Sequence, residues 1–510
     1  MLRTDPTTSG PSAAESERLA DAGFPISAVA QSVRFVRAHM RKILAISVVV
    51  LTPCFWHRHI EAGDLGSHVY NAWLAQLIEH GHAPGLWIAR QWNNVLFDFL
   101  LSALGTIFSL RLAEKIAVSV AVLIFFWGAF ALVGAATRRA PWFLLPLLAM
   151  ISYGWTFEMG FFNYYISLGL SFFSLAIFWH GKTWELFIAL ALAPLAFLAH
   201  PLGFIWLLAA AAYIGIAAAI SRRRQFVLFA AAAAALAILH LYLARHYIMD
   251  PPDFPYYFFT GGDQFVLFGA RYNLIKDAAI LLAIAAFVIE LIRRRREPRA
   301  GASYAIPLQL YLLAELGVVL LPDGIHLPQY PAAIALLTER LTSVSAVLAC
   351  CVLGAIRPRK WHWIGFAALA LAFFGFLYRD TAIIDKMETQ VERLVRTLPA
   401  NQRVMATVVP FPASRVVMQH IVDRACIGHC FSYGNYEPAS GQFRVRALPG
   451  NPYVMTNDRD TAAMEEGWYE VRPQDLPAYQ IYQCSLAGTD LCIAPLAAGD
   501  GNDDLGIHPP

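Results

Sequence analysis

The chain has 510 residues, of which 58% are hydrophobic and only 15% are charged. Soluble globular proteins carry about 25% charged residues, so the composition excludes an ordinary soluble protein and predicts a polytopic membrane protein. The formal net charge of +3 says little by itself, because the arrangement of basic residues matters more in a membrane protein. We expect no nucleic-acid partner.

Residues 1–40 are expected to form a disordered cytoplasmic tail. Residues 1–30 are rich in Ser, Thr, Pro, Gly and Ala. They lack the basic head and apolar core of a cleaved signal peptide.

Eleven apolar runs follow, within an expected transmembrane domain of residues 41–378. A helix needs about 20 apolar residues to cross about 30 Å of hydrocarbon. The predicted spans are residues 43–56, 113–136, 141–156, 164–180, 184–199, 202–220, 226–247, 273–292, 304–321, 341–357 and 361–378.

The basic residues of the short loops predict the orientation. They cluster at Arg34/Arg37/Arg41/Lys42, Arg138/Arg139, Arg222–Arg224, Arg293–Arg296 and Arg357/Arg359/Lys360. All these clusters fall on one side, the cytoplasmic side, if residues 57–112 stay outside. The apolar segment 97–110 is therefore expected to be an interfacial or re-entrant helix rather than a span.

The first outer loop begins with the unusually polar stretch "HRHIEAGDLGSHVYNAWLAQLIEHGHAP", residues 57–84. Asp64 opens an amphipathic helix that runs to Gly81, so it is a candidate N-cap, and this role would not exclude a catalytic one. The five histidines at 57, 59, 68, 80 and 82 show no i,i+4 pair, which disfavours a dedicated metal site. A divalent metal nevertheless remains an alternative.

Other polar residues are expected on the same outer side. They are Glu158 and Asn163 in the second outer turn, His200 in the third, Arg271 after an aromatic loop, and His326 and Arg340 in the loop 322–340. Their concentration predicts a cavity at the membrane surface. Each also has a plainer explanation: Glu158 at the water interface, Arg340 as an anchor of its span and His200 as an ordinary loop histidine.

From about residue 379 the composition changes to short β-prone runs separated by Pro, Gly and Asn. We expect residues 379–510 to form a small α+β domain on the outer side. It contains four cysteines, which allow three disulfide pairings, with a zinc site as the alternative. The remaining cysteines, Cys54, Cys350 and Cys351, lie in apolar runs and are expected to pack as small hydrophobic residues.

This order of features resembles the GT-C superfamily of membrane glycosyltransferases, which includes protein O-mannosyltransferases, aminoarabinose transferases and oligosaccharyltransferase catalytic subunits. A first span is followed at once by an acidic residue, Asp64 in "EAGDLGSHVY", and then by an amphipathic helix. A basic pair lies in the next cytoplasmic turn, and Glu158 occupies the following outer loop. As architecture the resemblance covers residues 43–360. The chain departs from the family where Leu65, not a second acid, follows Asp64, and no DxD-like motif is present in the second outer loop.

The resemblance implies an inverting transfer of a sugar from a polyprenyl-phosphate donor to a glycan, lipid or protein acceptor. It also implies a multi-pass protein of the bacterial cytoplasmic membrane that acts on the outer face. Asp64 would be the general base, supported by Glu61 and His68. The expected substrate-binding residues are Arg271 and Arg340 for the phosphate, and Glu158, Asn163, His200 and His326 for the sugar and its surroundings.

Two other classes remain open from the sequence. A lipid or small-molecule transporter would carry ionisable residues near the membrane midplane, where only Glu315 is a candidate. A non-catalytic membrane scaffold would use its outer domain to bind a partner. Within the enzyme class, an O-antigen ligase or polymerase is a closer alternative.

Overall fold

The computed structural model describes residues 28–500, except 182, 253, 256–257, 297–303, 410, 412, 419, 466–468 and 486–487. Most of the expected N-terminal tail lies outside these residues. Its last part differs from the expectation, because helix α2 (Ala28–Val50) begins before residue 40. The reason is aromatic packing, since Phe35 stacks on Trp142 with ring centroids 5.6 Å apart and Lys42 lies 3.6 Å from the same ring.

The chain is a helical protein of the membrane type. In the described part, six helices are long and apolar enough to cross a membrane: α5 (Leu110–Thr137), α8 (Phe162–His180), α10 (Pro201–Ala219), α11 (Arg222–His246), α14 (Leu337–Gly354) and α15 (Lys360–Val395). Shorter apolar helices are α4 (Leu96–Gly105), α9 (Thr183–Ala199) and α13 (Ala305–Leu320). Helix α12 (Tyr272–Arg296) occupies another predicted span and ends in four arginines.

Two predicted spans are not continuous helices. The run 43–56 is interrupted after α2 by the short 3-10 helix η1 (Thr52–Cys54), which contains Pro53. The run 141–156 is divided into η2 (Trp142–Leu144), α6 (Leu145–Ser152) and α7 (Trp155–Glu158). It breaks at Gly154, where a Cβ atom would lie 2.9 Å from the carbonyl oxygen of Gln264. A distant segment therefore occupies the space that a regular helix would need.

One end of the helical body gathers basic residues. Arg139, after α5, donates a hydrogen bond to the carbonyl of Gly354 at 2.9 Å, and Arg294 donates to that of Ala355 at 2.7 Å. Glu290 accepts a hydrogen bond from Arg293 at 2.6 Å and another from the backbone N–H of Arg357 at 3.4 Å. Three of the basic clusters predicted for one side thus lie together, at the C-terminal end of α14.

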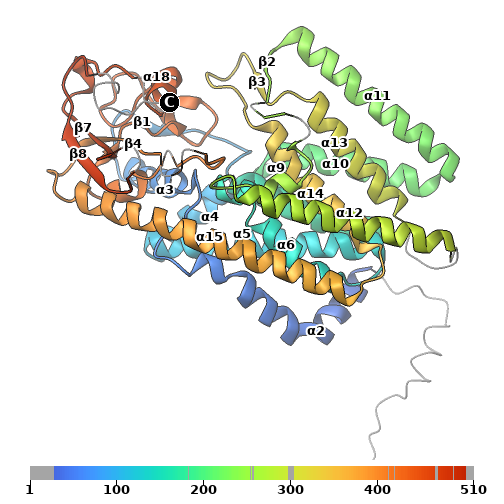
Figure 1. Cartoon of the computed structure of the whole chain (residues 1–510). Helices are drawn as coiled ribbons and strands as arrows, with labels where there is room; N and C mark the ends of the chain where they lie inside the picture. The colour runs from blue at the N-terminus through green and yellow to red at the C-terminus, as the bar shows by residue number, and fades with distance from the viewer. Residues whose placement is uncertain are drawn as a thin grey trace, which may run out of the picture.

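The C-terminal region is α+β. A four-stranded sheet has the order β5 (Phe431–Ser432), β4 (Arg403–Thr407), β7 (Ala478–Gln483) and β8 (Leu491–Pro495). Strands β5 and β7 are parallel to β4, and β8 is antiparallel to β7. The helices of this region are α16 (Asp423–Cys426), α17 (Glu437–Ser440) and α18 (Asp458–Glu465). In Figure 1 the sheet lies at one side of the molecule, and the long helix α15 reaches it from the helical body.

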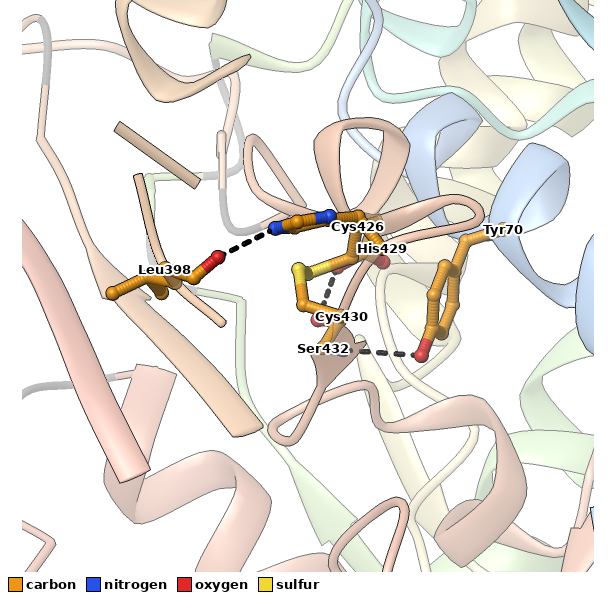
Figure 2. The surroundings of a disulfide bond; sticks show 7 residues. Tyr70, Leu398, Cys426, His429, Cys430 and Ser432 are labelled. Atoms are coloured by element: carbon orange, nitrogen blue, oxygen red, sulfur yellow. Dashed lines mark hydrogen bonds between the residues drawn. A yellow bond between two sulfur atoms is a disulfide. The ribbon is translucent and has the colours of Figure 1, made fainter. Parts of the chain in front are cut away.

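The four C-terminal cysteines form two disulfides, Cys426–Cys430 and Cys484–Cys492, which selects one of the three pairings and leaves no thiolate for zinc. Cys54, Cys350 and Cys351 are free and buried, as predicted. Figure 2 shows the first disulfide beside α3 (Leu65–Glu79), where the hydroxyl of Tyr70 accepts a hydrogen bond from the backbone N–H of Ser432 at 3.0 Å.

The first loop and the C-terminal region are joined by a sheet of their own. Strand β1 (Leu86–Ile88) pairs antiparallel with β6 (Val445–Ala447). A second small sheet pairs β2 (Ile248–Asp250) with β3 (Gly324–His326). The β1–β6 pairing brings residues 436–443 over the start of α3, and this contact builds the site described next.

Candidate functional site

A cavity of ≈ 120 Å³ lies where the first loop, the starts of α8, α10 and α14, and the C-terminal region meet. We call it the Asp64 cavity. It is lined by Asp64, His68, Asn93, Asn94, Phe161, Asn163, Tyr164, His200, Pro201, Tyr330, Ile334, Arg340, Tyr436, Gln442 and Phe443. Five of the residues selected from the sequence are among them: Asp64, His68, Asn163, His200 and Arg340.

Asp64 is held by its backbone. Its N–H donates a hydrogen bond to the carbonyl of Met159 at 3.0 Å, and the N–H of Gly63 donates to the carbonyl of Glu158 at 2.7 Å. Gly160 has a φ of +79°, and a Cβ atom there would lie 2.6 Å from the Asp64 nitrogen. Glycine is therefore required for this close approach of the two turns.

The Asp64 side chain remains available to the cavity. Asp64 occupies the N-cap position of α3, but its carboxylate makes no capping hydrogen bond. It accepts one from the Tyr436 hydroxyl at 3.3 Å, and the other carboxylate oxygen lies 3.7 Å from Nε2 of His420. The side chain is 16% exposed. Its position thus comes from the backbone hydrogen bonds to the turn 158–160, while most of the hydrogen-bonding capacity of its carboxylate is left for another partner.

Behind Asp64 lies a chain of buried polar side chains. Nδ1 of His68 is 2.9 Å from Asp98 Oδ1, and the Asn163 amide donates to Asp98 Oδ2 at 3.0 Å. Burial opposes a charge on His68, but attraction to Asp98 outweighs it and raises the pKa of His68 to about 9. His68 is therefore an imidazolium at neutral pH. Burial raises the pKa of nearby Glu437 to about 7, and its Oε1 lies 3.6 Å from His68 Nδ1.

Arg340 brings a second positive charge to the cavity from the first turn of α14. Its guanidinium carbon lies 4.1 Å from the centre of the Phe161 ring. Its Nε is buried and has no hydrogen-bond partner among the described residues. Within the same part of the chain, no carboxylate oxygen lies within 4.0 Å of its guanidinium nitrogens. This cation is consequently available to an anionic ligand.

His200 supplies an uncharged imidazole. Its Nδ1 accepts a hydrogen bond from the N–H of Leu202 at 3.1 Å and so caps α10, as an ordinary loop histidine would. Burial, followed by repulsion from Arg340, lowers the pKa of His200 well below its usual value. Its ring also lies edge-on to Tyr164, with centroids 5.4 Å apart.

Four selected residues do not line the cavity. Glu158 is buried, and it contacts the Asp64 segment through its backbone carbonyl rather than its carboxylate. Arg271 forms an ion pair with Asp380 and lines a separate cavity of ≈ 360 Å³. His326, on β3, lies 3.0 Å from Asp250 and is 47% exposed. Glu61 belongs to a different buried cluster, around Arg424.

Several residues that line the cavity or support its lining were not selected from the sequence. Asp98 could have been identified from the sequence, because its carboxylate interrupts the apolar run "FDFLL". Tyr436 and Phe443 had none, since only the β1–β6 pairing brings them to Asp64. Gln442 joins the same region to the loop 322–340 by donating to the carbonyl of Ala332 at 3.1 Å.

The candidate metal ligands of the described chain lie outside the Asp64 cavity. Among the described residues, the His, Cys, Asp and Glu side chains close enough to share an ion are His59, Glu61 and Glu388. Asp64 is outside this group. We therefore assign no metal-dependent step to Asp64.

Comparison with known proteins gives no further identification. No family model, curated protein or solved structure matches the chain.

Proposed function

We propose that the chain is a membrane glycosyltransferase of the GT-C type, which transfers a sugar from a polyprenyl-phosphate donor with Asp64 as the general base. One observation carries the proposal: a carboxylate with one long hydrogen bond, from a tyrosine hydroxyl, faces a cavity that also holds a guanidinium with no carboxylate within 4.0 Å among the described residues. These are Asp64 and Arg340. A general base beside an anion-binding group is the combination that displacement of a lipid phosphate requires.

Each of the charged cavity residues has its own role in the proposed reaction. An acceptor hydroxyl attacks the anomeric carbon while Asp64 accepts its proton, so that the hydroxyl oxygen becomes the new glycosidic oxygen. The bond between that carbon and the phosphate oxygen breaks, and its electron pair leaves with the phosphate. Attack opposite the leaving group inverts the anomeric centre. Arg340 stabilises the negative charge on the phosphate, because a guanidinium binds phosphate through two parallel hydrogen bonds.

His68 provides the second fixed positive charge. Asp98 keeps it protonated, and Asn163 holds Asp98 in place through its side-chain amide. A buried charge fixed before the reaction stabilises the leaving phosphate without reorganisation. His200, which is neutral, is suited to a hydrogen bond with a sugar hydroxyl, whereas both donors of the Asn163 amide are already used, on Asp98 and on the carbonyl of Asn94.

The arrangement of the helices supports action on the outer face. Helix α14 begins at the Asp64 cavity and ends beside the basic cluster of Arg139 and Arg294. Cytoplasmic loops carry the excess of Lys and Arg in membrane proteins, so the cavity would face the opposite side. The prenyl tail would lie between apolar helices. The acceptor would enter beside Tyr436 and Phe443, which the C-terminal domain contributes.

The decisive experiment is Asp64→Asn in the purified full-length protein, supplied with radiolabelled polyprenyl-phosphate sugars and candidate acceptors in lipid nanodiscs. We expect transfer to fall by about 100-fold or more, since general-base catalysis contributes about 10²–10⁴-fold. The matched control is Glu79→Gln, at the exposed end of the same helix. Full transfer by Asp64→Asn would eliminate Asp64 as the base. Movement of the labelled donor across vesicle membranes without transfer would instead identify a transporter.

A further inference from the structure

A second buried cluster of ionisable side chains lies immediately before Asp64 in the chain. It combines His59 and Glu61 of the first loop with Glu114 of α5, Glu388 of α15 and Arg424 of α16. These side chains come from four separate segments and are all almost inaccessible to solvent.

Arg424 does not satisfy every carboxylate around it. One terminal nitrogen donates to Glu114 at 2.5 Å and to the carbonyl of Ile60 at 2.9 Å. The other donates to Glu388 Oε1 at 2.5 Å. Glu61 is 3.7 Å away, beyond hydrogen-bond distance. One guanidinium thus faces three buried carboxylates and donates hydrogen bonds to two of them.

Glu61 is the carboxylate of this cluster that has no hydrogen-bond partner among the described residues. Its side chain is 0% exposed. Neither of its carboxylate oxygens has a hydrogen-bond partner among the described residues. A buried carboxylate without hydrogen bonds is strongly unfavourable, so this position calls for a bound proton or a bound cation.

The neighbouring atoms have the spacing of metal ligands. One ligand atom each from His59, Glu61 and Glu388 lies within 4.8 Å of the other two. Nδ1 of His59 is 3.5 Å from Glu388 Oε2, the oxygen that Arg424 does not use. Two ligands about 2.1 Å from a tetrahedral ion are about 3.4 Å apart. We propose that His59, Glu61 and Glu388 bind a divalent transition-metal cation such as Zn²⁺ or Mn²⁺.

The surroundings of His59 fit this assignment. Its Nε2 is 3.1 Å from Glu392, which orients the ring as an outer carboxylate does for many metal-bound histidines. Its Nδ1 is 2.8 Å from Asp385, so binding of the metal displaces the proton shared there and releases it. Mixed imidazole and carboxylate ligands are suited to Zn²⁺ and Mn²⁺ rather than to a soft cation.

The bound ion would have a positioning role. It joins residues 59–61, directly before the Asp64 turn, to α15, and Arg424 attaches the same group to the C-terminal region. None of the three ligands lines the Asp64 cavity. The inference does not depend on the glycosyltransferase proposal, because metal binding is measured without any sugar donor.

The test uses the full-length protein in detergent, stripped of metal and titrated with Mn²⁺ while free Mn²⁺ is followed by electron paramagnetic resonance. We expect one ion per chain, a nitrogen coupling from His59 in the spectrum of the bound ion, and at least 10-fold weaker binding in Glu61→Gln. Glu114→Gln, which changes a neighbour of Arg424 but no ligand, should retain the ion. So should Glu79→Gln.

Two results would overturn the site. One is a wild-type protein that binds neither Mn²⁺ nor Zn²⁺ at micromolar concentrations. The other is a bound ion whose spectrum lacks nitrogen coupling, which can be seen without making any variant. In either case Glu61 would be neutralised by a proton instead.

Discussion

The charge of His68 can be tested by removing the carboxylate that maintains it. Asp98→Asn keeps the size of the side chain but removes its negative charge, while the burial of His68 is unchanged. The pKa of His68 should then fall from about 9 to at or below its ordinary value of about 6.5. That difference corresponds to about 3 kcal/mol of favourable interaction between His68 and its surroundings.

The shift predicts a change in the pH dependence of donor binding. At pH 7.5 His68 is almost fully protonated in the wild-type protein, whereas at most about one tenth would be protonated in Asp98→Asn. If His68 binds the donor phosphate, the variant should bind it up to about tenfold more weakly at this pH. Towards pH 5.5 the difference between the two proteins should become smaller, because a larger fraction of the variant's His68 carries the imidazolium.

The assay is equilibrium binding of a polyprenyl-phosphate sugar to the protein in detergent micelles between pH 5.5 and 9.5. The narrowing of the difference in affinity towards pH 5.5 is the internal control, since it separates loss of charge from damage to the fold. Glu437 and Asp64 also face His68, so the variant's midpoint need not equal the value for a free histidine. Superimposable curves for the two proteins across the whole range would refute the role of His68.

Two further predictions follow from the site geometry. Arg340→Ala should weaken donor binding by at least about tenfold, because hydrogen bonds to charged groups contribute about 1.5–3 kcal/mol. The thermal unfolding temperature should change little. Unchanged affinity in a binding titration would show that Arg340 does not bind the phosphate. Gly160→Ala should lower the unfolding free energy by at least about 1 kcal/mol and reduce transfer, because its φ is +79° and the added Cβ would lie 2.6 Å from the Asp64 nitrogen. Wild-type stability and transfer in this variant would show that the close approach of the two turns is not required.

The free energy of unfolding should depend on pH through the protonation of His68, and the direction of this dependence can be stated. The folded-state pKa of His68 is above that of the unfolded chain, so its contribution is complete below about pH 6.5 and is lost as the pH rises through about 9. Asp98→Asn should therefore be less stable than the wild-type protein at pH 6, and this difference should shrink towards pH 9.5. Thermal unfolding at a series of pH values measures it.

The helices were predictable from the sequence where one local signal decides the structure. An apolar run long enough to span a bilayer is such a signal, and most of the predicted spans coincide with a helix within a few residues. The run 141–156 was not predictable, because it breaks where the carbonyl of Gln264 approaches Gly154. The C-terminal domain was predicted to start at residue 379, but α15 continues to Val395. Its last turns bury an apolar stripe, Met387, Val391 and Val395, in one hydrophobic cluster with Val404 and Ile481 of the C-terminal sheet.

The residues of the candidate site were predictable where an ionisable side chain lies at the end of an apolar segment, which is an unusual position for it. Asp64, His68 and Arg340 stand out as ionisable residues at the ends of apolar segments. Glu158 and Arg271 looked equally suitable, and only tertiary packing distinguishes them from the cavity residues, because it turns the Glu158 carboxylate away and pairs Arg271 with Asp380. Tyr436 depends on a strand pairing between residues 86–88 and 445–447, which no local pattern encodes.

The way in which Asp64 is held determines what its substitution can reveal. Its position depends on backbone hydrogen bonds to the turn 158–160 and on the absence of side chains at Gly63 and Gly160, whereas its carboxylate makes one long hydrogen bond. Asp64→Asn therefore removes a charge and leaves the supports in place, so a loss of transfer with an unchanged unfolding temperature would report on chemistry. Glu61 is the opposite case, because its side chain is wholly buried among charges. Any loss of transfer in Glu61→Gln would have to be judged against metal content before it is attributed to the reaction.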